Sequence, residues 1–252
     1  MSLVISSVFT YDEDASDYIL AVEAADGPTL EPLTRKAINE FVLGCKADGI
    51  WTALQACCIL AGARTLAGAL VPLRGPAPTN MGPFVSGDYD RVTGLKGDGA
   101  TKYLDSNRNN NADGQDNVHQ SVYVTTLPTI NVSLLGAGLN TTGATHANSD
   151  AFRNRSPVVA IAFTAVAGFR GHQRNNSSTM EYRTSANSGS VALASQLPSS
   201  EPCLVFARGT TGAPASISNA RLSYYSIGSA LDLAKLDARV TQLMAKFAAV
   251  IV

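Results

Sequence analysis

The sequence predicts a mainly β protein: a β-sandwich with a helical segment before it and one helix after it. Between residues 74 and 228, short apolar or alternating runs are separated by clusters of Gly, Ser, Asn and Pro, which is typical of sandwich strands and their turns. Before and after that region, apolar residues recur every three or four positions, which indicates helices. Charged residues make up only 15% of the chain, so small uncharged residues are abundant, as in loop-rich β proteins.

The helical N-terminal segment, residues 1–73, is expected to contain three helices and to attach the protein to a larger assembly. The first covers Asp12 to Asp26 and ends at Gly27-Pro28, a pair that cannot extend a helix. The second runs from Thr29 to Gly49, and the third continues the same period from Ile50 to Cys58. Trp51 lies on the apolar face of the third helix, where we expect a core anchor.

A domain boundary is expected after Leu73, because the next residues, Arg74 to Asn80 and then Met81-Gly-Pro, are rich in turn formers. The sandwich domain is predicted to cover residues 74–228. Its expected strands are, in chain order, Tyr103-Leu104, Ser121–Thr125, Val132–Leu135, Val158–Phe163, Ser190–Ala194, Leu204–Ala207 and Arg221–Ile227.

The last segment, residues 229–252, is predicted to be one amphipathic helix. Ser229 and Asp232 form a capping-box pattern at its start. Its apolar stripe has two interpretations: it packs on helices of the same chain, or it closes a short oligomeric bundle with other copies. The stripe consists of Leu233, Leu236, Val240, Leu243, Phe247 and Val250.

Charge and cysteine content restrict the function classes. The formal net charge of -1 and the pI of about 6.3 argue against nucleic acid as a partner. The four cysteines have neither CxxC spacing nor a neighbouring His, so reduced core thiols are expected instead of a zinc site. The most apolar stretch, Ile50 to Leu73, is interrupted by Gln55 and Arg64, which predicts no membrane span. The N-terminus lacks the pattern of a secretory signal, so we expect synthesis and retention in a cytoplasm.

Gly97 to Leu104, with the Asp98-Gly99 turn, looks like the opening strand of laminin G-like domains of the concanavalin A superfamily, and His119 to Thr125 is similar to the strand that follows in those domains. Ala220 to Asp237 resembles the closing strand and the tail that leads into a short helix. The resemblance covers roughly residues 85–235 and implies a concanavalin A-like jelly-roll sandwich.

A second resemblance covers more of the chain. Leu43 to Trp51, Ile59 to Leu66, Tyr103 to Asp113 and Leu231 to Leu243 look like a group of virion proteins encoded by tailed phages. Those proteins are generally taken to be tail-fibre, tail-tip or capsid-decorating components. The resemblance implies a location in the virion, with other virion proteins as partners. We also expect a homo-oligomer, for which a trimer is one option.

Catalytic patterns are scarce. Hydrolysis of a glycosidic bond needs two carboxyl groups on either side of it. Between Asp88 and Gly228 the only glutamates are Glu181 and Glu201, and neither has an acidic residue two to four positions away. The three histidines, His119, His146 and His172, lie beside no nucleophile or zinc motif. We therefore expect no enzymatic activity, with an Asp pair assembled by folding as the open alternative.

One polar loop has the spacing of a calcium site. Oxygen-bearing side chains occupy alternate positions, as in an EF-hand loop, and the twelfth position holds an Asp where the EF-hand has a longer, bidentate Glu. Asn110 replaces the turn glycine, however, and Arg108 adds a positive charge. The other interpretation is an Asn-rich surface turn whose side chains bond their own backbone. The candidate calcium ligands are Asp105, Asn107, Asn109, Asn111, Asp113 and Asp116.

Two further polar segments could bind a sugar or an anionic glycan of a bacterial surface. Phe152 to Arg155 and Arg170 to Asn176 are rich in Arg, His and Asn donors. Equally, they could be two ordinary solvated loops. The candidate ligand-binding residues are Arg153, Arg155, Arg170, His172 and Arg174.

The function that these patterns favour is a non-enzymatic virion protein, assembled in the bacterial cytoplasm, of the tail-fibre or tail-tip kind. Its loops would contact a glycan of the host surface. A capsid-decorating cement protein, which needs no ligand, is the first alternative. An enzyme that degrades a surface polysaccharide is the second, and the lack of paired carboxylates disfavours it.

Overall fold

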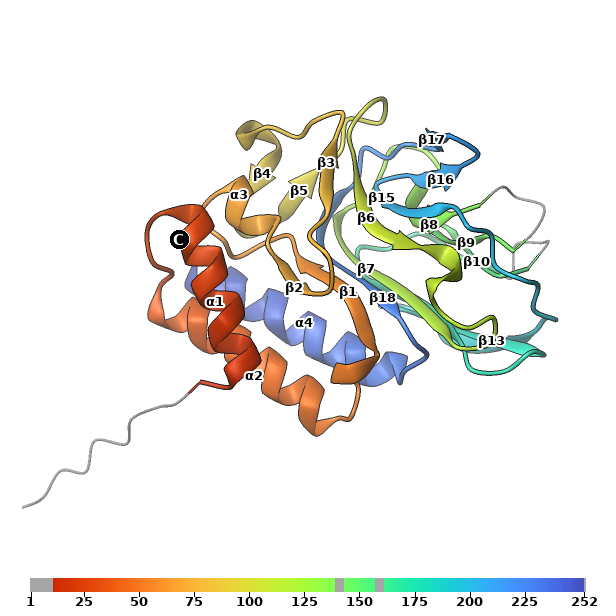
Figure 1. Ribbon diagram of the computed structural model, residues 1–252, viewed down its shortest axis with the longest axis horizontal. Coiled ribbons are helices and arrows are strands. Elements are labelled where there is room, and N and C mark those ends of the chain that lie inside the picture. The colour runs from red at the N-terminus through yellow and green to blue at the C-terminus, as the bar shows by residue number, and fades with distance from the viewer. Residues whose placement is uncertain (1–10, 139–142, 157–160, 252) are drawn as a thin grey trace, which may run out of the picture.

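The computed structural model describes residues 11–138, 143–156 and 161–251. The protein is mainly β, with two sheets and a layer of helices (Figure 1). The helices are α1 (Glu13–Asp26), α2 (Pro32–Ala47), α3 (Leu66–Ala69) and α4 (Leu233–Val250), and three short 3-10 turns are η1 (Trp51–Ala53), η2 (Ser86–Asp88) and η3 (Asn110–Ala112).

The first sheet contains nine described strands. Seven of them follow the order β14 (Ser188–Ala192), β13 (Thr179–Thr184), β12 (Gly168–Arg174), β7 (Val118–Thr126), β18 (Arg221–Gly228), β1 (Leu54–Ile59) and β2 (Pro72–Arg74). In addition, β5 (Gly94–Lys96) pairs with β18, and β4 (Tyr89–Asp90) pairs with β5. All of these pairs are antiparallel.

The second sheet also contains nine described strands. Its main order is β11 (Ile161–Ala162), β10 (Ala151–Asn154), β9 (Thr145–Asn148), β8 (Ser133–Ala137), β15 (Pro202–Val205), β6 (Tyr103–Asn109) and β3 (Thr79–Met81). The hairpin β16 (Arg208–Thr210) and β17 (Ala213–Ala215) joins it through a parallel pairing of β16 with β8.

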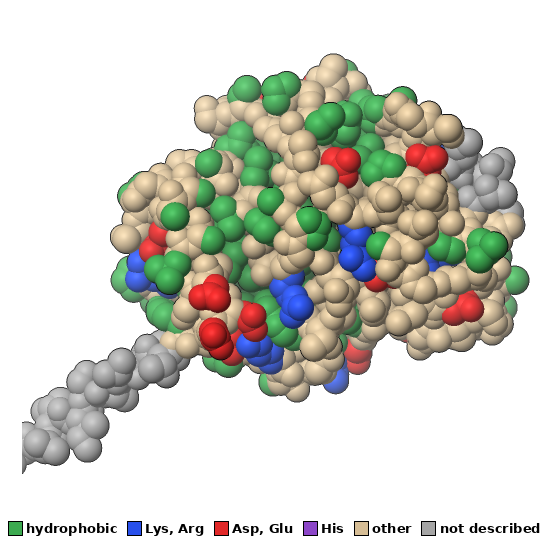
Figure 2. Space-filling model, in the orientation of Figure 1, with side chains coloured by type: hydrophobic (Ala, Val, Ile, Leu, Met, Phe, Trp, Pro, Cys, Tyr) green, Lys and Arg blue, Asp and Glu red, His purple; other side chains and the backbone are tan. Residues whose placement is uncertain are grey.

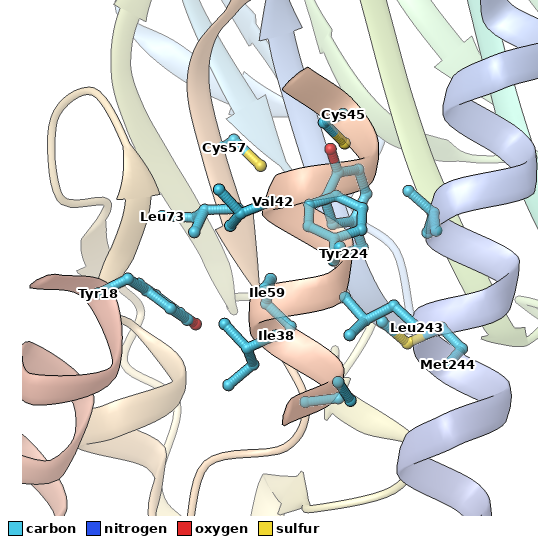
Figure 3. Close-up of a cluster of buried hydrophobic side chains, with 14 of the residues drawn as sticks. Tyr18, Ile38, Val42, Cys45, Cys57, Ile59, Leu73, Tyr224, Leu243 and Met244 are labelled. Carbon is cyan, nitrogen blue, oxygen red and sulfur yellow. The ribbon is translucent and has the colours of Figure 1, made fainter. Parts of the chain in front are cut away.

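The two faces of the first sheet bury two separate cores. One core lies against the second sheet and includes Cys58 and Tyr225. The other lies against α1, α2 and α4 and includes Cys57 and Tyr224 (Figure 3). Consecutive residues of one strand therefore pack on opposite faces, as the pleat of a strand requires. The molecule has three layers: helices, first sheet and second sheet.

The first and last helices, α1 and α4, were both predicted from the sequence, but α4 begins later than predicted. Asp12 caps α1, whose end is followed by Gly27 with a φ of 89°. Asp232 is the N-cap residue of α4, and its side chain accepts hydrogen bonds from Ala234 N at 2.9 Å and Lys235 N at 3.1 Å. The predicted start at Ser229 with a capping box was wrong, because the carboxylate of Asp232 already occupies the first free amides.

The predicted third helix, Ile50 to Cys58, was also wrong. That stretch forms η1 and then β1, which lies between β18 and β2. Because β1 is covered by helices on one face and by the second sheet on the other, five of its six residues are apolar and they do not alternate with polar ones. Periodicity alone cannot separate such a strand from a buried helix. The strand β2 spans the predicted boundary at residue 73, so residues on both sides of it share one sheet.

The apolar stripe of α4 packs within its own chain. Leu236, Val240, Leu243 and Phe247 are buried in the core between the helices and the first sheet. Arg239 on α4 also forms a bidentate ion pair with Asp48 at the end of α2, at 2.7 and 3.0 Å. The intramolecular interpretation of the stripe is therefore confirmed.

The surface carries few charges. On the face shown in Figure 2, uncharged polar and apolar groups cover most of the area, and acidic and basic side chains gather mainly at the lower left of the view. All four cysteines are buried and unpaired. Within the described ranges, no helix is both long and apolar enough to cross a membrane.

Candidate functional site

A hollow of about 750 Å³ opens beside the start of α4, on the face of the first sheet that carries the helices. We call it the α4 hollow. Strands β12, β13 and β14 contribute to its walls, and so does the turn that precedes α4. Its lining residues are Gln173, Asn175, Glu181, Tyr182, Arg183, Ser188, Gly189, Ser190 and Ala230 to Ala234.

The strand register explains why polar side chains meet in the α4 hollow. Gln173 on β12 is directly opposite Glu181 on β13, which in turn is opposite Ser190 on β14. Side chains opposite one another in antiparallel strands lie on the same face of the sheet. Phe169, four residues before Gln173 on β12, packs in the core beneath the helices, so this is the helix-side face.

Gln173 links the floor of the α4 hollow to the turn before α4. Its Nε2 donates to Glu181 Oε2 at 2.6 Å, and its Oε1 accepts from the backbone N–H of Leu231 at 3.0 Å. Gln173 itself is buried, whereas Glu181 is half-buried. One oxygen of the Glu181 carboxylate is therefore held in place, and the other has no partner among the described residues.

The charges around the α4 hollow are mostly compensated. Arg183 donates through Nε to Asp237 Oδ2 at 2.7 Å, and the second oxygen of Asp237 accepts from Thr241 at 3.0 Å. Asp232 is engaged as the cap of α4. The hollow thus offers carboxylate, amide and hydroxyl groups to a ligand without an unpaired cation among its described lining residues. Such a set suits a neutral ligand rich in hydroxyl groups.

The predicted ligand-binding residues lie on strands instead of loops. Arg153 belongs to β10 and Arg155 follows that strand, while β12 carries Arg170, His172 and Arg174. All five are buried, so the interpretation as two solvated loops was wrong. On β12 they alternate with Gly171 and Gln173. The cluster and the α4 hollow therefore occupy opposite faces of the same strand.

The buried guanidinium groups donate to backbone carbonyls. Arg155 bonds Asn110 O at 2.7 Å, and Arg174 bonds Leu193 O at 2.8 Å. Arg170 bonds the carbonyls of Ser149 and Val166, and Arg153 bonds that of Ser156. Burial lowers the pKa of Arg155 and of Arg170 to about 10. These contacts join strands and loops within the interior, and a role in binding a ligand stays a prediction.

His172 occupies the centre of the same buried group. Its Nδ1 accepts from Asn154 Nδ2 at 3.1 Å, and its ring lies 5.1 Å from that of Phe152. Burial lowers its pKa to about 3, so the ring is neutral at physiological pH.

The candidate calcium ligands are distributed along β6, η3 and the loop that follows. Asp105 accepts from the N–H of Asn107 at 2.8 Å, and Asp113 forms a bidentate ion pair with Arg108 at 3.0 and 2.6 Å. Asn109 ends β6, Asn111 lies in η3 and is exposed, and Asp116 is half-buried. The described residues contain no group of three or more His, Cys, Asp or Glu that could hold a metal. Calcium binding stays a prediction.

Sequence reasoning missed the α4 hollow. It considered Glu181 only as a glutamate without an acidic neighbour, and it did not consider Gln173 as a site residue. The signal that could have joined them is the polar run Asn175 to Ser178, a turn pattern between two alternating segments. A hairpin there places Gln173 and Glu181 opposite one another. In comparisons with known proteins, the chain matches no family model and no curated protein sequence.

Proposed function

We propose that this chain is a non-enzymatic virion protein of a tailed phage, a tail-fibre or tail-tip component that binds a host-surface glycan in the α4 hollow. The location in the particle rests on the sequence resemblance to phage virion proteins. The finer fold, a concanavalin A-like jelly roll, rests on the resemblance to laminin G-like domains and is compatible with two packed sheets whose pairings are antiparallel except that of β16 with β8.

The observation that supports glycan binding best is the ordered carboxylate of Glu181. Gln173 fixes one of its oxygens, and Glu181 lines an open hollow together with hydroxyl and amide groups. Sugar hydroxyls donate readily to a carboxylate, and a bond to a charged group contributes about 1.5–3 kcal/mol.

The test is the affinity of the purified protein for surface polysaccharides extracted from candidate host strains. Replacing Glu181 with Ala should weaken binding about tenfold or more, since about 1.4 kcal/mol corresponds to a factor of ten. Glu201→Ala is the matched control, because Glu201 precedes β15 in the second sheet, outside the hollow. Equal affinity of both variants, or no polysaccharide bound by the unmodified protein, would refute glycan recognition at this site.

A second candidate function is capsid decoration. It is favoured by exposed leucines on the helical layer, namely Leu20 on α1 with Leu33 and Leu43 on α2. Apolar side chains exposed at a surface are suited to contact another protein. Antibody labelling of intact virions separates the two functions: label at the tail supports host recognition, and label spread over the head supports a cement protein.

A further inference from the structure

The strand β14 is the terminal strand of the first sheet. Four of its five residues are exposed and the fifth is half-buried. Such an edge presents backbone N–H and C=O groups to any strand that can pair with it.

Two hydrogen bonds fix which residues of β14 bond inward to β13. Thr184 N donates to Asn187 O at 2.7 Å, and Leu193 N donates to Ser178 O at 2.7 Å. Because bonded and non-bonded pairs alternate in an antiparallel ladder, Gly189 and Val191 also bond inward. The N–H and C=O groups of the residues between them point outward, and those residues are Ser188, Ser190 and Ala192.

This edge lacks the usual protection against pairing. Exposed edge strands are normally blunted by charged side chains, proline or a bulge. From Thr184 to Ser200 the chain has no charged residue, and its only proline, Pro198, lies beyond β14. The pairing of β14 with β13 is regular from Thr179–Ala192 to Arg183–Ser188, without a register shift. An unprotected, regular edge of this kind is typical of a strand that is covered in the assembled state.

We propose that β14 pairs with β14 of a second copy of this chain, antiparallel, about a two-fold axis through Ser190. In this register Ser190 faces its own counterpart and Ser188 faces Ala192, so the outward N–H and C=O groups meet in bonded pairs. Gly189 faces Val191 in the closely spaced non-bonded pairs, where the missing side chain of glycine leaves room for the valine. The strand is thus complementary to itself in both backbone bonding and side-chain size, and no like charges oppose one another.

The assembly would stop at two copies, because the two-fold contact uses the β14 edge of both copies. The first sheets of the two copies would then form one continuous sheet. Ser188 and Ser190 line the α4 hollow, so the two hollows would flank the interface on the same face. This inference does not depend on what the hollow binds.

Cross-linking through a cysteine at position 190 tests the axis directly. The four natural cysteines are buried, so a surface thiol introduced by Ser190→Cys reacts alone. On the two-fold axis this thiol lies next to its own copy, and oxidation should link the copies at least about tenfold faster than random encounter does. Ala186→Cys is the matched control, since Ala186 is exposed in the same hairpin but would face Ala194 of the other copy. Equal rates for the two variants would overturn the proposal.

Sedimentation velocity on the unmodified full chain gives the independent measurement. We expect a dimer that Ser190→Lys converts to a monomer, because two lysines would then oppose one another on the axis. Ala186→Lys should remain dimeric, and all three proteins should have similar melting temperatures when dilute. A monomer at every concentration, or an oligomer that Ser190→Lys leaves intact, would show that β14 is not the interface.

Discussion

All three histidines of the chain are buried. His119 donates through Nδ1 to Ser229 O at 2.6 Å, and His172 accepts from Asn154. Burial lowers the pKa of His119 to about 4, and the pKa values of His146 and His172 to about 3. Each ring therefore stays neutral in the folded state at a pH where it would be protonated in the unfolded chain.

The histidines predict a loss of stability in mild acid. Below a pH of about 6.5 the unfolded state binds protons that the folded state does not, so the free energy of unfolding falls as pH falls toward the folded pKa values. At about pH 4.5 each histidine should lower the free energy of unfolding by roughly 2–3 kcal/mol relative to neutral pH. Urea denaturation between neutral pH and pH 4.5 measures this loss.

A histidine variant separates this effect from that of the carboxylates. The pKa of Glu31 is lowered to about 2 by its hydrogen bonds from Arg91, and the resulting stability is likewise lost in acid. His172→Gln should therefore remove one histidine's contribution to the fall in the free energy of unfolding between neutral pH and pH 4.5. The contributions of the other two histidines and of the carboxylates should remain. If the variant and the unmodified protein have parallel curves, His172 does not titrate between the two states.

The burial of the arginines could not be predicted from the sequence pattern. The alternation of Arg170, His172 and Arg174 with Gly171 and Gln173 is visible in the sequence and indicates a strand. A half-buried strand is expected to turn its polar side chains to solvent, and here they face the second sheet. The reason is that the guanidinium groups meet backbone carbonyls from distant loops, which no local pattern reveals.

At the level of elements, prediction succeeded for helices with one apolar stripe and for strands bounded by turn residues, and it failed for β1. The helices α1, α2 and α4 each carry one apolar stripe, and all three were predicted. The strands β7 and β18 were also predicted, because Gly, Asn, Ser and Pro mark their ends. The strand β1 was taken for a helix, since burial on both faces removes the alternation that distinguishes a strand.

The N-cap of α4 should contribute measurably to stability. Asp232→Ala removes the acceptor for the amides of Ala234 and Lys235, and it should lower the free energy of unfolding by about 1 kcal/mol. Asp232→Asn keeps a capping oxygen and should cost only a few tenths of that. Urea denaturation at neutral pH compares the three proteins. Equal losses in the Ala and Asn variants would indicate that charge, and not capping, is what the residue contributes.

The order of strands in the whole molecule could not be predicted. The strand β18 lies between β7 and β1, which precede it in the chain by about 100 and 165 residues. Pairings of this kind depend on which apolar faces fit together after collapse, and short-range patterns contain no such information. The α4 hollow is equally non-local, because it forms only where the β12–β14 edge meets the turn before α4.

The first sheet contains residues from both sides of the predicted boundary at residue 73, so the two parts should not fold separately. A fragment of residues 74–252 lacks β1, most of β2, α1 and α2. It would leave one edge of β18 largely unpaired, and it would expose apolar side chains such as Tyr224 and Phe247 that those elements bury. Uncovering so many large apolar side chains, at about 1.5–3 kcal/mol each, exceeds the 5–15 kcal/mol that stabilises a typical domain.

We therefore expect the 74–252 fragment to lack a cooperative unfolding transition in urea, monitored by far-UV circular dichroism, while the full chain unfolds in one step. Adding residues 11–73 as a separate peptide should restore the transition, because β1 can then pair with β18 and α2 can pack on α4. A sharp transition of the fragment alone would instead establish residues 74–252 as an independent folding unit, with the helices α1 and α2 as an attachment.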